Sequence, residues 1–369
     1  MGALLSCLRG VIGGNTSSSG VTHPTSVTVN GTPVRINKLL GEGGYAYVFA
    51  ATRTGADGTS RSVALKRFVV RDADALSSVL SEIELLRALS PHPRIVAYVD
   101  HQRVSSQKSG VPAGGSAASR SSLLPSEEDV GAAGDVWLVM EMAAGSLRAE
   151  ADRRIADFQK EKGSSSARLA PFTAAEIRRI LADVCEALAQ VHGMRPPVAH
   201  NDLKLENILM TSDGRYQLCD FGSARPYSIT CKTALQVNKA EALLDATMTV
   251  LYRPPEACDL WQGITVDTQA DTWAIGVVLY SLLAGAMPFD ANPRQVLAVQ
   301  YEPLSAELRA NADFRPLCDL CTQGLLVQDP AQRLNLDGLT TRLHEIDPAM
   351  VPHPTRLGDV RRVMPPMPA

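Results

Sequence analysis

Three polar residues with regular spacing, Asp202, Lys204 and Asn207, form the most informative pattern in this chain of 369 residues. In such a pattern the Asp accepts the proton of an attacking hydroxyl, the Lys neutralises a phosphate, and the Asn binds Mg²⁺. All three must reach one transferring phosphoryl group, so we expect them on one short, rigid loop over residues 200–207. The pattern predicts phosphoryl transfer with ATP and Mg²⁺ as cofactors.

A Gly-rich turn and a strand lysine, both upstream of this loop, predict the site for ATP. The glycines within 41–44 let backbone N–H groups approach phosphates without a Cβ in the way. Lys66 would bind the α- and β-phosphates and pair with a carboxylate from the helix expected over 72–89. Glu82 is the preferred partner, and Glu84 is the alternative. The other predicted ATP contacts are apolar walls and backbone groups from Leu40, Gly41, Glu42, Gly43, Val48, Ala64, Met140, Glu141, Met142 and Leu209.

Hydrophobic patterning divides the chain into a β-rich region followed by a helical region. Apolar residues at helical spacing predict helices over 72–89 and after Thr173, which opens a capping box with Glu176. The segments 105–134 and 150–168 are polar, with few large apolar residues, so we expect disordered inserts there. Strands are predicted over 34–40, 46–52, 62–70, 95–101, 136–140 and 216–219.

Taken in order, these motifs resemble the eukaryotic protein kinases from residue 34 to about 346. The resemblance implies an α+β, bilobal fold, with a β-rich N-terminal lobe that carries one helix over about 34–140. A hinge over about 141–146 and a mainly helical C-terminal lobe over about 147–346 would follow. Lys204 resembles the serine/threonine branch, so the resemblance implies ATP-dependent phosphorylation of serine or threonine in protein substrates.

The resemblance also assigns roles to further residues by position. Asp220, in an Asp-Phe-Gly triplet, would bind Mg²⁺ together with Asn207. Thr249 would be catalytic through hydrogen bonds to Asp202 and Lys204. Structural support would come from a buried Asp that holds the catalytic loop and from an Arg–Glu pair behind the activation segment, which are Asp271, Arg333 and Glu256.

Within the kinases, the chain looks like the numb-associated kinase family, which includes the adaptor-associated, cyclin-G-associated and myristoylated/palmitoylated kinases. The likeness is carried by residues 41–48, 185–192, 202–209 and 218–224. It implies an extra helix in the activation segment and vesicle-traffic substrates such as clathrin-adaptor subunits. We expect no long endocytic-motif tail like that of the adaptor-associated members, and the start of the chain is more similar to that of the acylated member.

The first residues match the pattern for N-myristoylation, with Gly2 exposed after Met removal and Ser at position six. Cys7 is close enough to take a second acyl chain. One acyl chain binds a protein to a membrane only marginally, whereas two anchor it stably. We therefore expect residues 1–33 to be a flexible, lipid-anchored tether at the cytoplasmic face of a membrane. An ordinary Met-Gly start with an idle cysteine is the alternative. The Pro-rich residues 347–369 are expected to form an extended tail.

Composition excludes several other classes. The formal net charge is −3 and there is no long basic run, so we expect no nucleic-acid partner. The seven cysteines have no framework spacing and no secretory signal precedes them, which indicates a reducing compartment. Cys318 and Cys321 are expected to be neighbours on a helix, not a redox or zinc site. The sequence contains no run of 18 apolar residues, so we expect no transmembrane helix.

Two rival functions remain open at this point. Asn201 stands where catalytic loops of this kind usually carry an Arg, which favours a pseudokinase that acts as a scaffold. A kinase that acts on small molecules is the second rival. The Pro254-Pro255-Glu256 segment and Asp271 favour a protein kinase over that second rival, since both belong to the lobe that carries a peptide platform.

Overall fold

The computed structural model describes residues 23–43, 46–105, 134–162, 172–226 and 228–349. These residues divide into two units. The N-terminal unit holds the described residues up to 92 and those from 96 to 143, and the C-terminal unit holds 93–95 and the residues from 144 onward. The chain therefore passes into the C-terminal unit within the segment that is expected to be a hinge.

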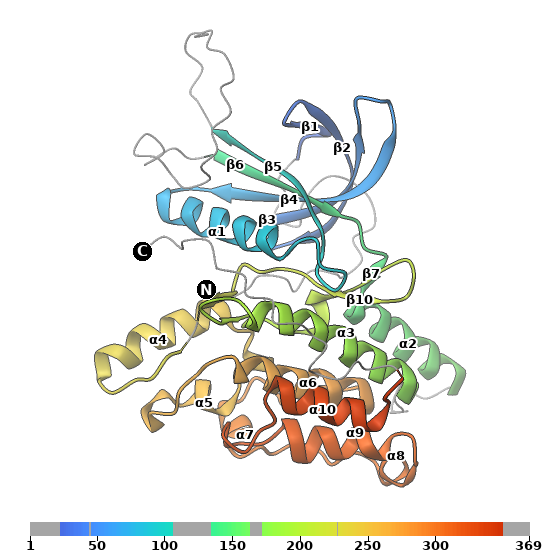
Figure 1. Cartoon of the computed structure of the whole chain (residues 1–369), viewed down its shortest axis with the longest axis vertical. Coiled ribbons are helices and arrows are strands. Elements are labelled where there is room, and N and C mark those ends of the chain that lie inside the picture. Colours follow the sequence, from blue (N-terminus) through green and yellow to red (C-terminus); the bar gives the residue numbers. More distant parts are fainter. Residues whose placement is uncertain (1–22, 44–45, 106–133, 163–171, 227, 350–369) are drawn as a thin grey trace. The chain divides into compact units, whose positions relative to one another are not determined.

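The N-terminal unit is a six-stranded antiparallel sheet with one helix, α1 (Ala73–Leu89), beside it (Figure 1). The strand order is β1-β2-β3-β4-β6-β5. Asp72 caps α1 by accepting a hydrogen bond from the backbone N–H of Ala75, which explains why the helix begins there. The strands are β1 (Ser26–Val29), β2 (Thr32–Glu42), β3 (Ala46–Thr54), β4 (Ser60–Val70), β5 (Tyr98–Ser105) and β6 (Gly134–Glu141).

The two faces of this sheet have different tasks because side chains alternate along each strand. One face carries the fully buried core, which includes Phe49, Leu65 and Val139. The register pairs Val48 with Lys66 and Ala64 with Met140, so these four residues share the opposite face. The alternation therefore places the predicted nucleotide residues together and away from the core.

The C-terminal unit is mainly helical and is organised around α6 (Gln269–Ala284). Residues from Ala270 to Leu283 on α6 are all buried, as expected for a helix that is apolar on every side. Gly276 permits a close approach, since a Cβ there would lie 2.9 Å from Leu325. The other α-helices are α2 (Leu147–Lys162), α3 (Ala174–His192), α4 (Ala234–Thr247), α5 (Pro255–Cys258), α7 (Pro293–Leu297), α8 (Ala306–Ala310), α9 (Arg315–Asp319) and α10 (Leu336–Ile346).

Short elements link these helices and carry much of the polar chemistry. The π-helix η5 (Leu320–Leu325) packs on α6. Two small sheets have the orders β10-β9-β7 and β11-β8. Their strands are β7 (Gly145–Ser146), β8 (Val198–Ala199), β9 (Ile208–Met210), β10 (Tyr216–Leu218) and β11 (Arg225–Pro226), and the 3-10 turns are η2 (Leu205–Asn207), η3 (Val250–Tyr252) and η4 (Leu260–Gln262).

Two expectations from composition need correction. Strand β1 lies inside the expected tether, because Val27 and Val29 alternate with β-branched Thr28 and pair with β2. Helix α2 occupies much of the expected insert 150–168. Its apolar face buries Leu147 and Ala151, while its polar face is linked by ion pairs at helical spacing. The segments 106–133, 163–171 and 350–369, and residues Gly2 and Cys7, lie outside the described residues.

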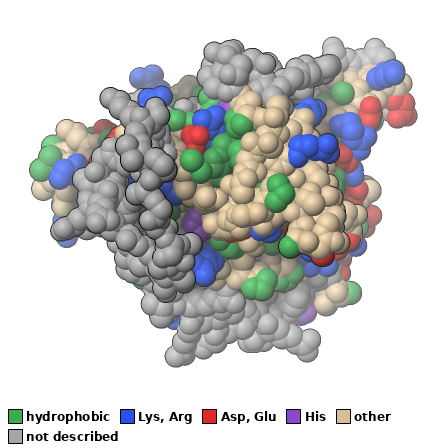
Figure 2. Space-filling model, turned by 90° about the horizontal axis from the view of Figure 1, so that it is seen from above, with side chains coloured by type: hydrophobic (Ala, Val, Ile, Leu, Met, Phe, Trp, Pro, Cys, Tyr) green, Lys and Arg blue, Asp and Glu red, His purple; other side chains and the backbone are tan. Residues whose placement is uncertain are grey.

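Charged side chains on the face of the molecule that is seen from above are mixed (Figure 2). Lys and Arg side chains occur there at several separate places, with Asp and Glu side chains also present. Mixing of both signs agrees with the small formal net charge of −3. Within the part of the chain that the structure describes, no helix is both long enough and apolar enough to cross a bilayer.

Candidate active site

The three residues of the opening pattern converge in the C-terminal unit, on the loop between β8 and β9. The Nζ of Lys204 lies 2.7 Å from the Oδ2 of Asp202. The side-chain amide of Asn207 donates to the backbone carbonyl of Asp202 at 2.8 Å. All three side chains are buried. Lys204 and Asn207 therefore both hold Asp202 in a defined position.

Thr249 completes this cluster from a point far along the chain. Its hydroxyl donates to the Oδ1 of Asp202 at 2.6 Å and accepts from the Nζ of Lys204 at 3.0 Å. Thr249 precedes η3 directly, so the start of that turn is fixed against the catalytic loop. The arrangement is the one that the resemblance implied for these residues.

Asp271 fixes the backbone of the catalytic loop from the first turn of α6. Its Oδ2 accepts from the N–H of His200 at 2.8 Å and lies 2.8 Å from the Nε2 of His192. Its Oδ1 accepts from the N–H of Asn201 at 2.9 Å. Burial favours a higher pKa for Asp271, but the hydrogen bond and charge of His192 and the contacts with His200 outweigh burial and hold the pKa below its ordinary value.

Asn201, the unusual residue of the loop, has a structural task in this chain. Its backbone is left-handed, with φ 63°, a conformation that Asn tolerates better than most residues. Its side-chain amide donates to the carbonyl of Ser223 at 3.1 Å and more weakly to that of Ala199 at 3.4 Å. Asn201 thus links the catalytic loop directly to the residues that follow the Asp-Phe-Gly triplet.

Asp220 is placed next to the catalytic loop by strand pairing. Strand β10, which ends at Leu218, runs antiparallel to β9, and the N–H of Cys219 donates to the carbonyl of Asn207 at 3.0 Å. Asp220 follows directly and adopts a left-handed φ of 61°. A carboxylate and an amide oxygen, brought to neighbouring positions in this way, are ligands of the kind that Mg²⁺ prefers.

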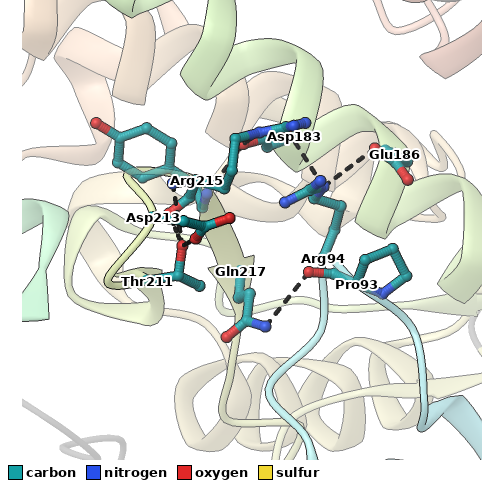
Figure 3. A network of polar contacts seen from close by, with 9 residues as sticks. Pro93, Arg94, Asp183, Glu186, Thr211, Asp213, Arg215 and Gln217 are labelled. Atoms are coloured by element: carbon teal, nitrogen blue, oxygen red, sulfur yellow. Dashed lines mark hydrogen bonds and ion pairs between the residues drawn. The ribbon is translucent and has the colours of Figure 1, made fainter. Parts of the chain in front are cut away.

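A network of charged side chains around the buried Asp183 supports the strand that leads to Asp220 (Figure 3). The backbone carbonyl of Arg94 accepts from the N–H of Leu218 at 2.8 Å. The guanidinium of Arg94 lies between Glu186, at 3.2 Å, and Asp183, at 3.4 Å, both on α3. Arg215 also donates to Asp183, at 2.6 Å. Residues 93–95 are held to the C-terminal unit by these contacts.

In the N-terminal unit, the lysine predicted to bind phosphates has its carboxylate partner. The Nζ of Lys66 lies 2.7 Å from the Oε1 of Glu82 on α1, and both side chains are at most 10% exposed. The turn of α1 therefore presents Glu82, and not Glu84, to Lys66. An ion pair with so little access to solvent fixes the direction of the lysine side chain.

The residues expected to surround ATP in the N-terminal unit lie on neighbouring strands. Gly41 pairs with Val48, and the N–H of Gly43 donates to the carbonyl of Ala46 at 2.7 Å, which closes the Gly-rich hairpin. The N–H of Glu141 donates to the carbonyl of Ala97 at 3.0 Å, so that N–H is committed within the unit. The half-buried members of the predicted set are Leu40, Glu42, Gly43, Val48, Ala64, Met140 and Met142, and in the C-terminal unit Leu209.

The pair predicted behind the activation segment is fully buried. Arg333 makes two parallel contacts with Glu256, at 2.7 and 2.8 Å, and neither side chain is exposed. The guanidinium also donates to the carbonyls of Val327 and Gln269 and lies 5.0 Å above the ring of Trp273. Because its donors are satisfied, this buried pair avoids the usual cost of an unpaired charge.

Sequence reasoning missed the supporting charges Arg94, Asp183 and Arg215. Their only signal in the sequence is an Asp at a buried position of the α3 pattern, between Ala182 and Val184.

The thiols of Cys318 and Cys321 are buried and burial raises both pKa values, so both cysteines are unreactive core residues. Among the described residues, no group of three or more His, Cys, Asp or Glu side chains is arranged to hold a metal ion.

Comparison with known proteins agrees with this geometry. Residues 34–343 match the family model described as the protein kinase domain. This chain belongs to the protein kinase family. It is 30% identical to a probable serine/threonine-protein kinase of Dictyostelium discoideum, over 83% of this chain and 24% of that protein. It is 33% identical to the serine/threonine-protein kinase ppk30 of Schizosaccharomyces pombe, over 74% of this chain and 25% of that kinase.

A further relative is the actin-regulating kinase 1 of Saccharomyces cerevisiae, 28% identical over 86% of this chain and 44% of that protein. The chain thus spans less than half the length of these three relatives. Protein kinases use ATP and Mg²⁺ in general. The donor set fits that metal, since Asn207 and Asp220 supply oxygen atoms, and Mg²⁺ when bound neutralises charge on the phosphates.

The buried Glu256–Arg333 pair generates a stability prediction. We expect Glu256→Gln to lower the free energy of unfolding by about 3–5 kcal/mol, because it leaves the guanidinium buried without its counter-charge. The matched control is Glu345→Gln, which breaks an exposed pair with Arg342 at 3.1 Å and should cost less than about 1 kcal/mol. Chemical denaturation measures both. Equal losses in the two variants would contradict the prediction.

Proposed function

We propose that this chain is an active serine/threonine protein kinase that transfers the γ-phosphoryl group of ATP to protein hydroxyls. The single observation that carries the proposal is the contact between Asp202, Lys204 and Thr249. One carboxylate is held at 2.7 Å from an ammonium and 2.6 Å from a hydroxyl. A carboxylate fixed in this way is suited to accept the proton of a serine or threonine hydroxyl as that oxygen attacks.

The neighbouring groups have complementary tasks in this proposal. Lys204 stabilises negative charge on the transferring group, and Thr249 holds the carboxylate in one orientation. Asn207 donates its amide N–H groups to Asp202, so its amide oxygen is left to face a metal ion together with Asp220. Lys66, oriented by Glu82, would hold the phosphates of ATP.

The rival proposal is a pseudokinase scaffold, and Asn201 is the residue that favours it. Asn201 takes no group away from the catalytic cluster, because its side chain contacts the backbone carbonyls of Ser223 and Ala199. Its backbone N–H is bound by Asp271. We therefore favour an enzyme in which Asn201 positions the loop.

For substrates, we propose proteins of vesicle traffic, such as clathrin-adaptor subunits, with this chain as a relative of the numb-associated kinases. The supporting observation is helix α4, which lies inside the activation segment and begins with a capping box between Thr233 and Gln236. Arg253 holds its other end by donating to the carbonyls of Leu244 and Met248. An extra helix at this position is what that resemblance implies.

We also propose that the chain is anchored to the cytoplasmic face of a membrane through acylation of Gly2 and Cys7. The support is the sequence pattern around Gly2, with a second acylation site five residues later. Two acyl chains give stable anchoring, whereas one gives only marginal binding.

The central test is phosphotransfer from Mg-ATP to casein by the full chain and by Asp202→Asn. We expect Asp202→Asn to lower the rate by about 10²–10⁴-fold, because the proton acceptor is lost. Asp337→Asn, an exposed carboxylate on α10, is the control and should keep the full rate. Equal rates for Asp202→Asn and the control would contradict the enzyme proposal.

A clathrin-adaptor subunit should be phosphorylated with a higher kcat/KM than casein, and no preference would reject the substrate proposal alone.

Metabolic labelling with a myristate analogue tests the anchor. We expect Gly2→Ala to abolish labelling and to release the protein from the membrane fraction, since the acceptor amine is specific to an N-terminal glycine. Cys7→Ser is the companion variant, and it should keep the myristate label but weaken membrane retention. Labelling that is unchanged in Gly2→Ala would reject the proposal.

A further inference from the structure

A cavity of about 910 Å³ lies in the C-terminal unit beside the end of α6. Its wall continues through the loop after α6 and through the residues between α7 and α8. None of the catalytic residues lines it, so it is separate from the site described above. Its lining includes Tyr280, Phe289, Asp290, Tyr301, Glu302 and Ser305.

The aromatic part of this wall is a chain of rings in contact with one another. The ring of Tyr301 makes edge-on contacts with Tyr280, at 5.3 Å between centroids, and with Phe289, at 5.7 Å. Phe289 in turn stacks on Trp273 at 5.6 Å. Tyr280 and Phe289 are buried whereas Tyr301 is half-buried, so the accessible aromatic surface of the pocket belongs mainly to Tyr301.

The backbone that leads into Tyr301 is held in an uncommon conformation. The N–H of Gln300 donates to the carbonyl of Gln295 at 2.9 Å, and the N–H of Val299 donates to that of Val296 at 3.0 Å. These two bonds form the left-handed turn that often ends a helix, a position that favours glycine. Val299 occupies it with φ 48°, which is strained for a β-branched residue. Strain of this kind persists where the surroundings over-determine a functional geometry.

The polar part of the wall is acidic. Asp290 and Glu302 both line the cavity and are exposed, and the polar residues Gln295, Gln300 and Ser305 also line it. Among the described residues that line the cavity there is no Lys, Arg or His. The hydroxyl of Tyr280 donates to the carbonyl of Glu302 at 2.7 Å and so ties the acidic segment to α6. Carboxylates that line the same pocket as an accessible aromatic ring favour a planar cation as its ligand.

We propose that this pocket binds an arginine side chain that is presented by a partner protein. The guanidinium stacks on the ring of Tyr301 and donates hydrogen bonds to the carboxylates of Glu302 and Asp290. Arginine fits better than lysine because its planar group can stack on an aromatic face and contact a carboxylate through two N–H groups at once. The proposal does not depend on phosphotransfer, since the cavity lacks the catalytic residues.

The test uses two short, uncharged Gly/Ser peptides that differ only in one central residue, arginine or its neutral isostere citrulline. Their dissociation constants for the full chain are measured by NMR titration. We expect the arginine peptide to bind at least about fivefold more tightly than the citrulline peptide. Tyr301→Leu should weaken the arginine peptide by about two- to fivefold and leave the citrulline peptide unchanged. Glu302→Gln should also weaken only the arginine peptide.

Matched variants separate the pocket from general surface charge. Glu307→Gln removes an exposed carboxylate from α8 that does not line the cavity, and it should not change arginine binding. Tyr301→Phe keeps the aromatic face and should bind like the original chain. Equal affinity for arginine and citrulline peptides would overturn the proposal, as would an equal effect of Glu302→Gln and Glu307→Gln. Dodecanoate serves as the probe for an apolar ligand. If the original chain binds dodecanoate but not the arginine peptide, and Tyr301→Leu loses that binding, the proposal is overturned in favour of an apolar ligand.

Discussion

The carboxylate of Asp271 is the constraint on which the catalytic part of this molecule depends. It sits in the first turn of α6, a helix that is buried on every side, and it accepts hydrogen bonds from the backbone N–H groups of His200 and Asn201. A helix at the core of the C-terminal unit is thereby joined directly to the residues that precede Asp202. A buried carboxylate that lost these partners would be strongly destabilising, so the loop and the helix position each other.

The same device recurs around the activation segment. Glu256 is held by Arg333, and Asp183 is held by Arg215 and Arg94, in each case as a buried carboxylate whose partners are charged. These pairs add little net stability compared with apolar packing of the same volume. Their contribution is to position the chain, because a movement that breaks one pair leaves a buried charge without its partner, at a high cost in free energy. The segment before Asp220 is therefore held at Arg215, and the segment after Thr249 is held at Glu256.

The sequence predicts those parts of the site whose chemistry is local. Asp202, Lys204 and Asn207 lie on one loop, and their spacing alone predicts that all three side chains reach the same phosphoryl group. The choice of Glu82 over Glu84 is harder to make, because two positions on one helix point in different directions and only packing decides between them. The partner of Asp183 could not be predicted, since Arg215 lies 32 residues away along the chain.

Composition misleads where polar residues are ordered by their neighbours. Helix α2 has the polar sequence of a disordered insert, yet Leu147 and Ala151 bury one face of it, and Arg154 binds Glu150 and Glu176. A polar face that is linked by ion pairs satisfies its charges while the helix is packed. The helical spacing of a few apolar residues, such as Leu147 and Ala151, is therefore a better guide than average polarity to whether such a segment folds.

The most direct test of the role of Asp271 is the kcat of Asp271→Asn with Mg-ATP and casein, measured beside the KM for ATP and the unfolding temperature. The account predicts a folded protein whose kcat is lower by about 10²-fold, because the loop that carries Asp202 shifts out of position. The KM for ATP should change less than the kcat, since Lys66 and Glu82, which would hold the phosphates, belong to the N-terminal unit. A folded Asp271→Asn variant with an unchanged kcat would contradict the account.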